Sequence, residues 1–171
     1  MEIKDFNIDF ESLKDGKHQF VYEIDDEFFR FFEQSPVTKA AMTVGAELEK
    51  KPNLLMLTLD LKGNVVVECD RCLDDIDISI NSRHKLYVKF SDEEIEEPEM
   101  IHIPEGTRRI KTAKYIYEYI ILNIPIRNVH PDDEKGNPTC NPKMLRKLEE
   151  LSKEEENKTD PRWNSLKTLL N

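Results

Sequence analysis

The strongest constraint on the fold is a strict two-residue alternation of apolar and polar residues in the middle of the chain. Successive side chains of a β-strand point to opposite faces, so this period predicts strands with one buried face. The buried positions are expected to be Leu55, Leu57, Leu59, Leu61, Val65, Val67 and Cys69, and then Ile76, Ile78 and Ile80.

Two short polar sequences in this region predict turns. Lys62-Gly63-Asn64 and Asn81-Ser82 interrupt the alternation, and Gly and Asn are residues that turns favour. Further strands are expected over residues 18–24, 83–90 and, briefly, 101–103. Together these segments predict an antiparallel β meander.

Helices are expected on either side of these strands. Asp25 or Asp26 is a candidate N-cap for a short aromatic helix, and apolar residues recur at helical spacing over residues 112–123. Asn141-Pro142 and Asp160-Pro161 each combine a cap with a first-turn proline. Strands followed by helices, without βαβ alternation, predict an α+β fold with a C-terminal helical segment over residues 141–171.

Size and charge narrow the class of protein. The chain has 171 residues and a formal net charge of −10, with no apolar run long enough for a membrane helix. We expect a single domain over residues 1–171, in the cytoplasm, without a membrane partner. The acidic stretch at about 91–99 holds six carboxylates and predicts a solvated loop.

The three cysteines do not suggest a disulfide framework, because their number is odd and cytosolic thiols stay reduced. Cys69 and Cys72 have a spacing that lets both sulfurs bind one ion at a turn, and His130 with Cys140 would complete a tetrahedral zinc site. Buried thiols are the competing interpretation, because Cys69 is in phase with Val67 and the turn lacks the glycine of typical zinc knuckles. A redox role and a Cys140–His130 catalytic dyad are weaker alternatives.

Nothing in the sequence indicates an enzyme. The chain has no glycine-rich phosphate loop, no HExxH helix and no nucleophile elbow. We therefore expect neither catalysis nor a small-molecule substrate, and no cofactor other than zinc.

Several cationic and aromatic residues are candidates for binding RNA or another partner. Four of them, Arg83, Lys85, Tyr87 and Lys89, share one face of the strand expected at 83–90. There the cations flank an aromatic ring, as in proteins that bind single-stranded RNA on a sheet. A solvated sheet face and a terminal helix packed on the protein's own sheet would explain the same patterns. The candidates are Arg71, Arg83, Lys85, Tyr87, Lys89, Arg108, Arg109, Arg162 and Trp163.

Three motifs in order resemble the YceD family of large ribosomal RNA accumulation proteins. They are Cys-Asp-Arg-Cys-Leu at residues 69–73, Ile-Leu-Asn-Ile-Pro-Ile followed by His130 and Cys140, and Asp-Pro-Arg-Trp-Asn-Ser-Leu-Lys-Thr-Leu from residue 160. The resemblance covers roughly residues 40–171. It implies a bacterial, cytoplasmic, non-enzymatic factor needed for accumulation or processing of large-subunit (23S) ribosomal RNA.

Two functional hypotheses follow from the resemblance and the charge. The chain binds precursor ribosomal RNA through a local cationic face, or it is an acidic adaptor for a basic large-subunit ribosomal protein or assembly factor.

Overall fold

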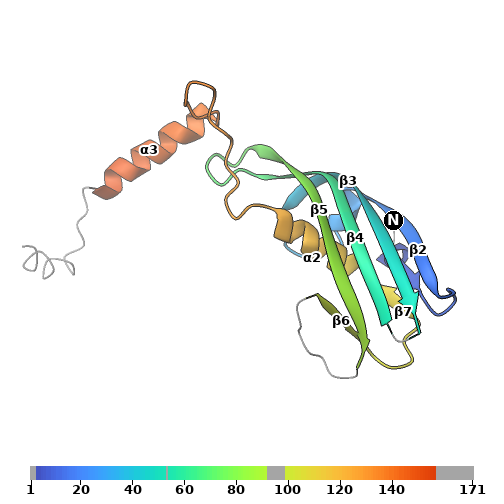
Figure 1. Ribbon diagram of the computed structural model, residues 1–171. Coiled ribbons are helices and arrows are strands. Elements are labelled where there is room, and N and C mark those ends of the chain that lie inside the picture. Colours follow the sequence, from blue (N-terminus) through green and yellow to red (C-terminus); the bar gives the residue numbers. More distant parts are fainter. Residues whose placement is uncertain (1–2, 53, 92–98, 157–171) are drawn as a thin grey trace, which may run out of the picture. The chain divides into compact units, whose positions relative to one another are not determined.

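The structure, a computed structural model, describes residues 3–52, 54–91 and 99–156 (Figure 1). The chain forms two compact units. Unit 1 contains the described residues up to Glu68 together with those from Asp75 to Asn128, and unit 2 contains Cys69–Asp74 and the described residues from Val129 onward.

Unit 1 is built on a five-stranded sheet with the order β2-β3-β4-β5-β6. The first four strands form an antiparallel meander, and β6 pairs with β5 in parallel. The strands are β2 (Gly16–Ile24), β3 (Val37–Lys51), β4 (Leu54–Glu68), β5 (Asp75–Phe90) and β6 (Met100–Ile103).

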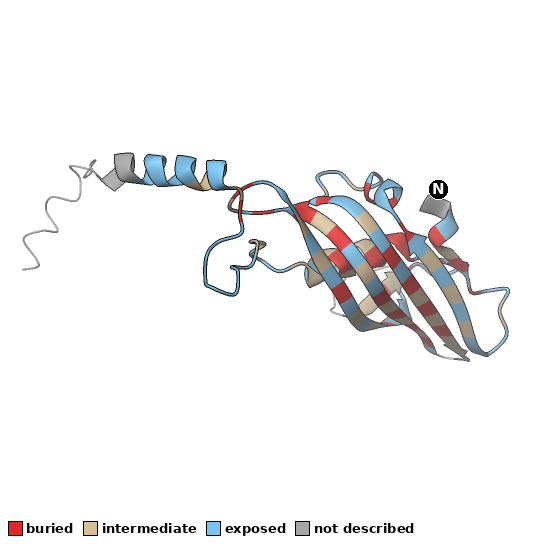
Figure 2. Cartoon of the chain, turned by 90° about the horizontal axis from the view of Figure 1, so that it is seen from above, coloured by how far each residue is buried: buried red, intermediate tan, exposed pale blue. Residues whose placement is uncertain are grey.

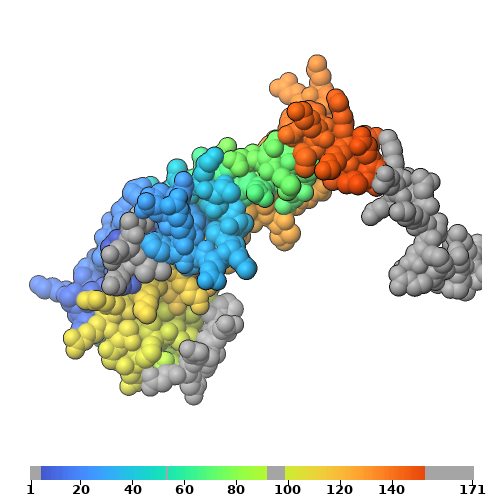
Figure 3. All heavy atoms as spheres, turned by 180° about the vertical axis from the view of Figure 1, so that it is seen from behind, coloured from blue at the N-terminus to red at the C-terminus, as the bar shows by residue number. Residues whose placement is uncertain are grey.

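One face of the sheet, here called the inner face, is covered by short elements. These are η1 (Ile3–Phe6), α1 (Asp26–Phe29), α2 (Ala113–Asn123) and the two-stranded sheet of β1 (Asn7–Asp9) with β7 (Arg109–Lys111). Seen from behind, N-terminal segments and the segment around residues 100–115 lie over the sheet (Figure 3).

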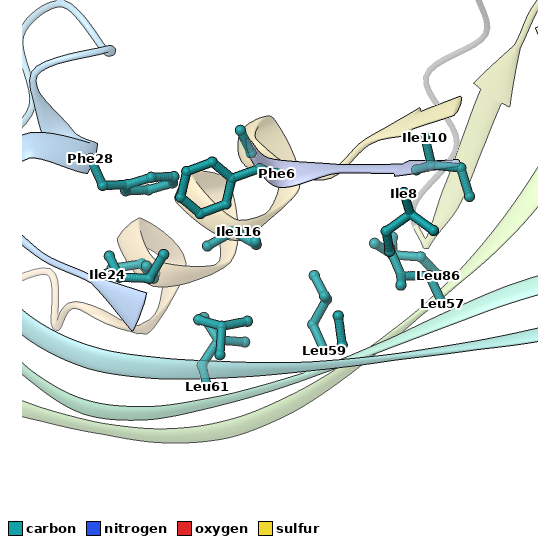
Figure 4. Close-up of a cluster of buried hydrophobic side chains, with 14 of the residues drawn as sticks. Phe6, Ile8, Ile24, Phe28, Leu57, Leu59, Leu61, Leu86, Ile110 and Ile116 are labelled. Carbon is teal, nitrogen blue, oxygen red and sulfur yellow. The ribbon is translucent and has the colours of Figure 1, made fainter. Parts of the chain in front are cut away.

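The core lies between the sheet and this cover. Leu57, Leu59 and Leu61 of β4 point toward Ile8, Ile116 and the aromatic rings of Phe6 and Phe28 (Figure 4). Each of the three leucines is fully buried, and such burial stabilises the fold by about 2–3 kcal/mol per side chain. Buried and exposed positions alternate along the strands (Figure 2), so the opposite, outer face of the sheet carries the polar residues.

The two predicted turns inside the meander are wrong. Gly63 and Asn64 lie within β4, and Asn81 and Ser82 lie within β5, so two long strands replace four short ones. Gly63 is needed for a close approach of two strands, because a Cβ atom there would collide with the carbonyl oxygen of Ala41. Its φ of +143° also disfavours other residues.

The expected helices are confirmed where the structure describes them. Asp25 caps α1 by accepting hydrogen bonds from the N–H groups of Glu27 and Phe28. The predicted helix at 112–123 is α2, which follows Thr112. The α+β class, with a mostly antiparallel sheet followed by two helices, is therefore confirmed.

Unit 2 consists of a turn, a proline-bearing connection and α3 (Pro142–Glu156). Asn141 caps α3 by accepting the N–H of Lys143 at 3.1 Å. Residues 92–98 of the loop predicted at about 91–99 lie outside the described residues, and so does the terminal helix predicted after Asp160. In the part of the chain that the structure describes, no helix is long and apolar enough to cross a membrane.

A candidate metal centre

The first two cysteines lie on a tight turn in unit 2. The N–H of Cys69 donates to the carbonyl of Asp74, and the N–H of Leu73 donates to the carbonyl of Cys69, both at 2.9 Å. Leu73 has a φ of +63°, in the left-handed region that glycine usually occupies. The missing glycine therefore does not prevent a knuckle-like turn, because a leucine adopts that conformation here.

The other two candidate ligands are at either end of a folded connection, residues 130–140. Asp133 organises it: its Oδ1 atom accepts the N–H groups of Lys135 and Asn137, each at 2.8 Å. The hydroxyl of Thr139 donates to the carbonyl of Pro131 at 2.6 Å. These bonds bring the two ends of the connection together, as the bridge between Asp132 and Pro138 also shows.

The four predicted ligands meet in one cluster, here called the Cys₃His cluster: Cys69, Cys72, His130 and Cys140. Their ligand atoms all lie within 4.8 Å of one another. The Cys69 and Cys140 sulfurs are 3.9 Å apart, and His130 Nδ1 lies 3.5 Å from the Cys72 sulfur and 3.9 Å from that of Cys140. A tetrahedral zinc site with Zn–S bonds of about 2.3 Å has ligand separations of about 3.5–3.8 Å, close to these values.

The cluster is shielded from solvent. The three cysteines are at most 2% exposed, and all of them are free thiols. Burial alone would raise the pKa of Cys69, but N–H groups of Arg71, Cys72 and His130 hydrogen-bond to its sulfur and lower the pKa to about 6. Burial raises the pKa of Cys140, and the neighbouring thiols Cys69 and Cys72 raise it further.

This arrangement is chemically suited to hold a structural metal ion. Four protein ligands with three sulfurs and one imidazole nitrogen match closed zinc sites, whereas catalytic zinc keeps one position open. Backbone N–H groups directed at a sulfur stabilise its thiolate, which is the form that binds metal. The cluster therefore has the ligand set and the spacing that a metal ion needs, and the Cys69 sulfur is stabilised as the thiolate.

The predicted RNA-binding residues of β5 lie together on the outer face of the sheet. Arg83, Lys85, Tyr87 and Lys89 are all exposed, as the alternation predicts. Arg83, however, is held by Asp60 on β4: its Nε donates to Oδ1 at 2.8 Å, and Nη2 donates to Oδ2. The hydrogen bond and the charge of Arg83 lower the pKa of Asp60.

The other predicted binding residues are placed separately. Arg108 and Arg109 lie at β7, where Arg108 pairs with Glu11 at 3.0 Å and Arg109 pairs with Asp9 at 3.5 Å. Arg71 lies half-buried on the cysteine turn. Arg162 and Trp163 lie outside the described residues.

The comparisons with known proteins identify the family. A family model described as large ribosomal RNA subunit accumulation protein YceD matches residues 57–170, about two thirds of the chain. The chain belongs to the YceD family. The match includes the whole Cys₃His cluster and all of β5. No curated protein and no solved structure gave a significant match.

The description of the YceD family specifies a role in accumulation of the large ribosomal RNA and mentions no enzymatic activity. Sequence reasoning found all four residues of the cluster but missed those that shape it. Leu73 gave no signal because leucine rarely has positive φ. Asp133 and Asn137 flank a Gly136 turn, which is a recognisable signal for the bend in the connection.

Proposed function

We propose that this YceD-family chain is a cytoplasmic, non-enzymatic factor in ribosome biogenesis that binds precursor large-subunit ribosomal RNA. Family membership is the observation that carries the proposal, because the family is described by accumulation of that RNA. The exposed cations around Tyr87 on β5 support direct contact, because RNA-binding sheets combine cations with exposed rings.

The Cys₃His cluster is proposed to hold one zinc ion. Its role is structural: zinc would join the cysteine turn to the connection that precedes α3. Without the ion, the four side chains do little to hold these two chain segments together. The free energy of zinc binding would therefore contribute directly to the stability of this part of the fold.

Local charge matters more than total charge for this function. A net charge of −10 repels a polyanion at long range, so contact depends on a small cationic surface. On β5 this surface consists of Arg83, Lys85 and Lys89, of which Arg83 is paired with Asp60.

The test is binding of precursor large-subunit RNA by wild type and by a variant with Arg83, Lys85 and Lys89 changed to Glu. We expect weaker binding and a shallower salt dependence, with the free energy of unfolding changed by less than about 1 kcal/mol because the sites are exposed. A control with Lys14, Lys39 and Lys135 changed to Glu carries the same charge change on exposed residues elsewhere. Equal binding by both variants would remove β5 from the interface.

The acidic adaptor is the second candidate function. The charge of −10 favours it, because a basic ribosomal protein would be attracted to such a chain. Titration of a purified basic large-subunit ribosomal protein, in parallel with RNA and over the same salt range, separates the two functions.

A further inference from the structure

A groove of about 740 Å³ lies in unit 1 at the end of the sheet where β3, β4, β5 and β6 come together. Its walls are both apolar and cationic. The residues that matter here are Leu54, Tyr87, Phe90, Met100, Lys51 and Lys89.

The groove gathers apolar side chains that are exposed to solvent. Leu54 is 40% exposed, Tyr87 37% and Phe90 45%. Among the described residues only one other large aromatic side chain, Phe31, is comparably exposed. Exposed apolar side chains that gather at one place mark a binding surface more often than scattered ones do.

Tyr87 is at the centre of an apolar row across three strands. It is directly opposite Met56 on β4 and Met100 on β6. Paired residues point to the same face of a sheet, so a methionine flanks the tyrosine on each side. Thioether groups pack well against aromatic rings and adapt to what lies above them.

Cations border this row. Lys85 and Lys89 are two residues before and after Tyr87 on the same strand and therefore share its face, about 13 Å apart. Among the described residues, no ion pair of either lysine is found. The one carboxylate that lines the groove, Glu11, is paired with Arg108. Lys89 lines the groove, Lys85 lies beside it, and Lys51 is paired with Glu49. The positive charge next to Tyr87 therefore comes from Lys85 and Lys89.

We propose that this groove binds unpaired bases of single-stranded RNA, with a base stacked on Tyr87 and the adjoining phosphates near Lys85 and Lys89. The inference rests on the proposed function and specifies the form of RNA that is recognised. A ring between two cations on one strand fits a base with phosphates on both sides, whereas a peptide segment would not require that charge pattern. Because two lysines supply the charge, stacking must provide most of the affinity.

The test is fluorescence anisotropy of the full chain with labelled oligouridine and with its duplex with oligoadenosine. We expect the single strand to bind more tightly than the duplex. Tyr87→Leu should weaken single-strand binding about tenfold, because stacking on one ring contributes at least that much. Tyr87→Phe, which keeps the ring, should bind within about twofold of wild type. Phe31→Leu is the matched control outside the groove and should bind like wild type.

Circular dichroism on each variant checks that the fold is retained. The inference is overturned if oligouridine fails to bind wild type, if the duplex binds equally well, or if Tyr87→Leu binds oligouridine like wild type. It is also overturned if Tyr87→Leu no longer binds a basic ribosomal protein while its affinity for RNA is unchanged. Precursor RNA is titrated with the same samples to distinguish the two proposals. If wild type and Tyr87→Leu bind precursor RNA equally well, the proposed function stands and the groove is excluded as the binding site.

Discussion

The sulfur of Cys72 lies 3.5 Å from Nδ1 of His130, although 58 positions separate the two residues in the chain. Closing a loop of that length costs conformational entropy, and a thiol–imidazole contact alone offsets little of it. A metal ion bound by both residues would offset far more. This pair is therefore where the metal hypothesis makes its sharpest predictions.

Purified protein is predicted to contain about one zinc ion per chain, because the Cys₃His cluster offers four ligands for one tetrahedral site. Cys72→Ser and His130→Ala should each lose most of the zinc and lower the melting temperature. His18→Ala, which changes a histidine outside the cluster, should keep it. Plasma emission spectrometry together with thermal denaturation gives the answer, and a metal-free wild type with an unchanged melting temperature after chelation would contradict the metal centre.

Zinc is predicted to be retained at pH 7 and released as the pH falls below about 6. Metal binds the thiolate form, and hydrogen bonds that outweigh burial lower the pKa of Cys69 to about 6, so protons compete for this sulfur only in acid. Raising the pH above 7 should release nothing. A metallochromic dye added during acid titration measures the release, and loss of zinc on going from pH 7 to pH 9 would show that the sign of this argument is wrong.

Gly63→Ala is predicted to destabilise the protein by about 3 kcal/mol, because the new methyl group would collide with backbone of β3 in addition to adopting an unfavourable φ. Gly16→Ala is the matched control: its φ is +130°, but no atom lies within 4 Å of the added Cβ. It should cost about 1 kcal/mol. Urea denaturation measures both, and equal costs would mean that strand contact at Gly63 is unimportant.

Asp60→Asn is predicted to tighten RNA binding, because it releases the guanidinium of Arg83 from its ion pair. One additional phosphate contact should steepen the salt dependence by about 0.7 in the logarithmic slope. Asp77→Asn makes the same charge change on an exposed residue near the other end of β5 and serves as the control for net charge. Identical gains in the two variants would assign the effect to total charge rather than to Arg83.

Much of unit 1 could be predicted from local pattern alone. The odd-numbered residues of β4 from Leu55 to Val67 form the inward-facing row, as the alternation predicts. Only Gly63 lacks a large side chain in this row. Glycine is common both in turns and where strands approach closely. The role of Gly63 depends on its contacts with β3, which are distant in sequence and cannot be inferred from the residues next to it. The same is true of Arg83, whose partner Asp60 becomes apparent only from the strand register.

Other elements were out of reach for different physical reasons. β3 has the same two-residue alternation, with Met42, Val44, Ala46 and Leu48 buried, but the small Ala46 and Gly45 weaken its contrast. β1 and β7 have three residues each, too few to show a period, and form through pairing across about a hundred positions. In the Cys₃His cluster, local spacing indicated Cys69 and Cys72, whereas their meeting with His130 and Cys140 depends on tertiary folding.

Direct contact with precursor ribosomal RNA is the central claim, and crosslinking in living cells tests it most directly. RNA crosslinked to the full chain would be purified and sequenced. The comparison is the variant in which Arg83, Lys85 and Lys89 are changed to Glu. The account predicts enrichment of precursor large-subunit RNA over small-subunit RNA for wild type, and loss of that enrichment for the variant. Crosslinked RNA without such enrichment, together with a large-subunit ribosomal protein bound equally by both chains, would contradict it and establish the adaptor role.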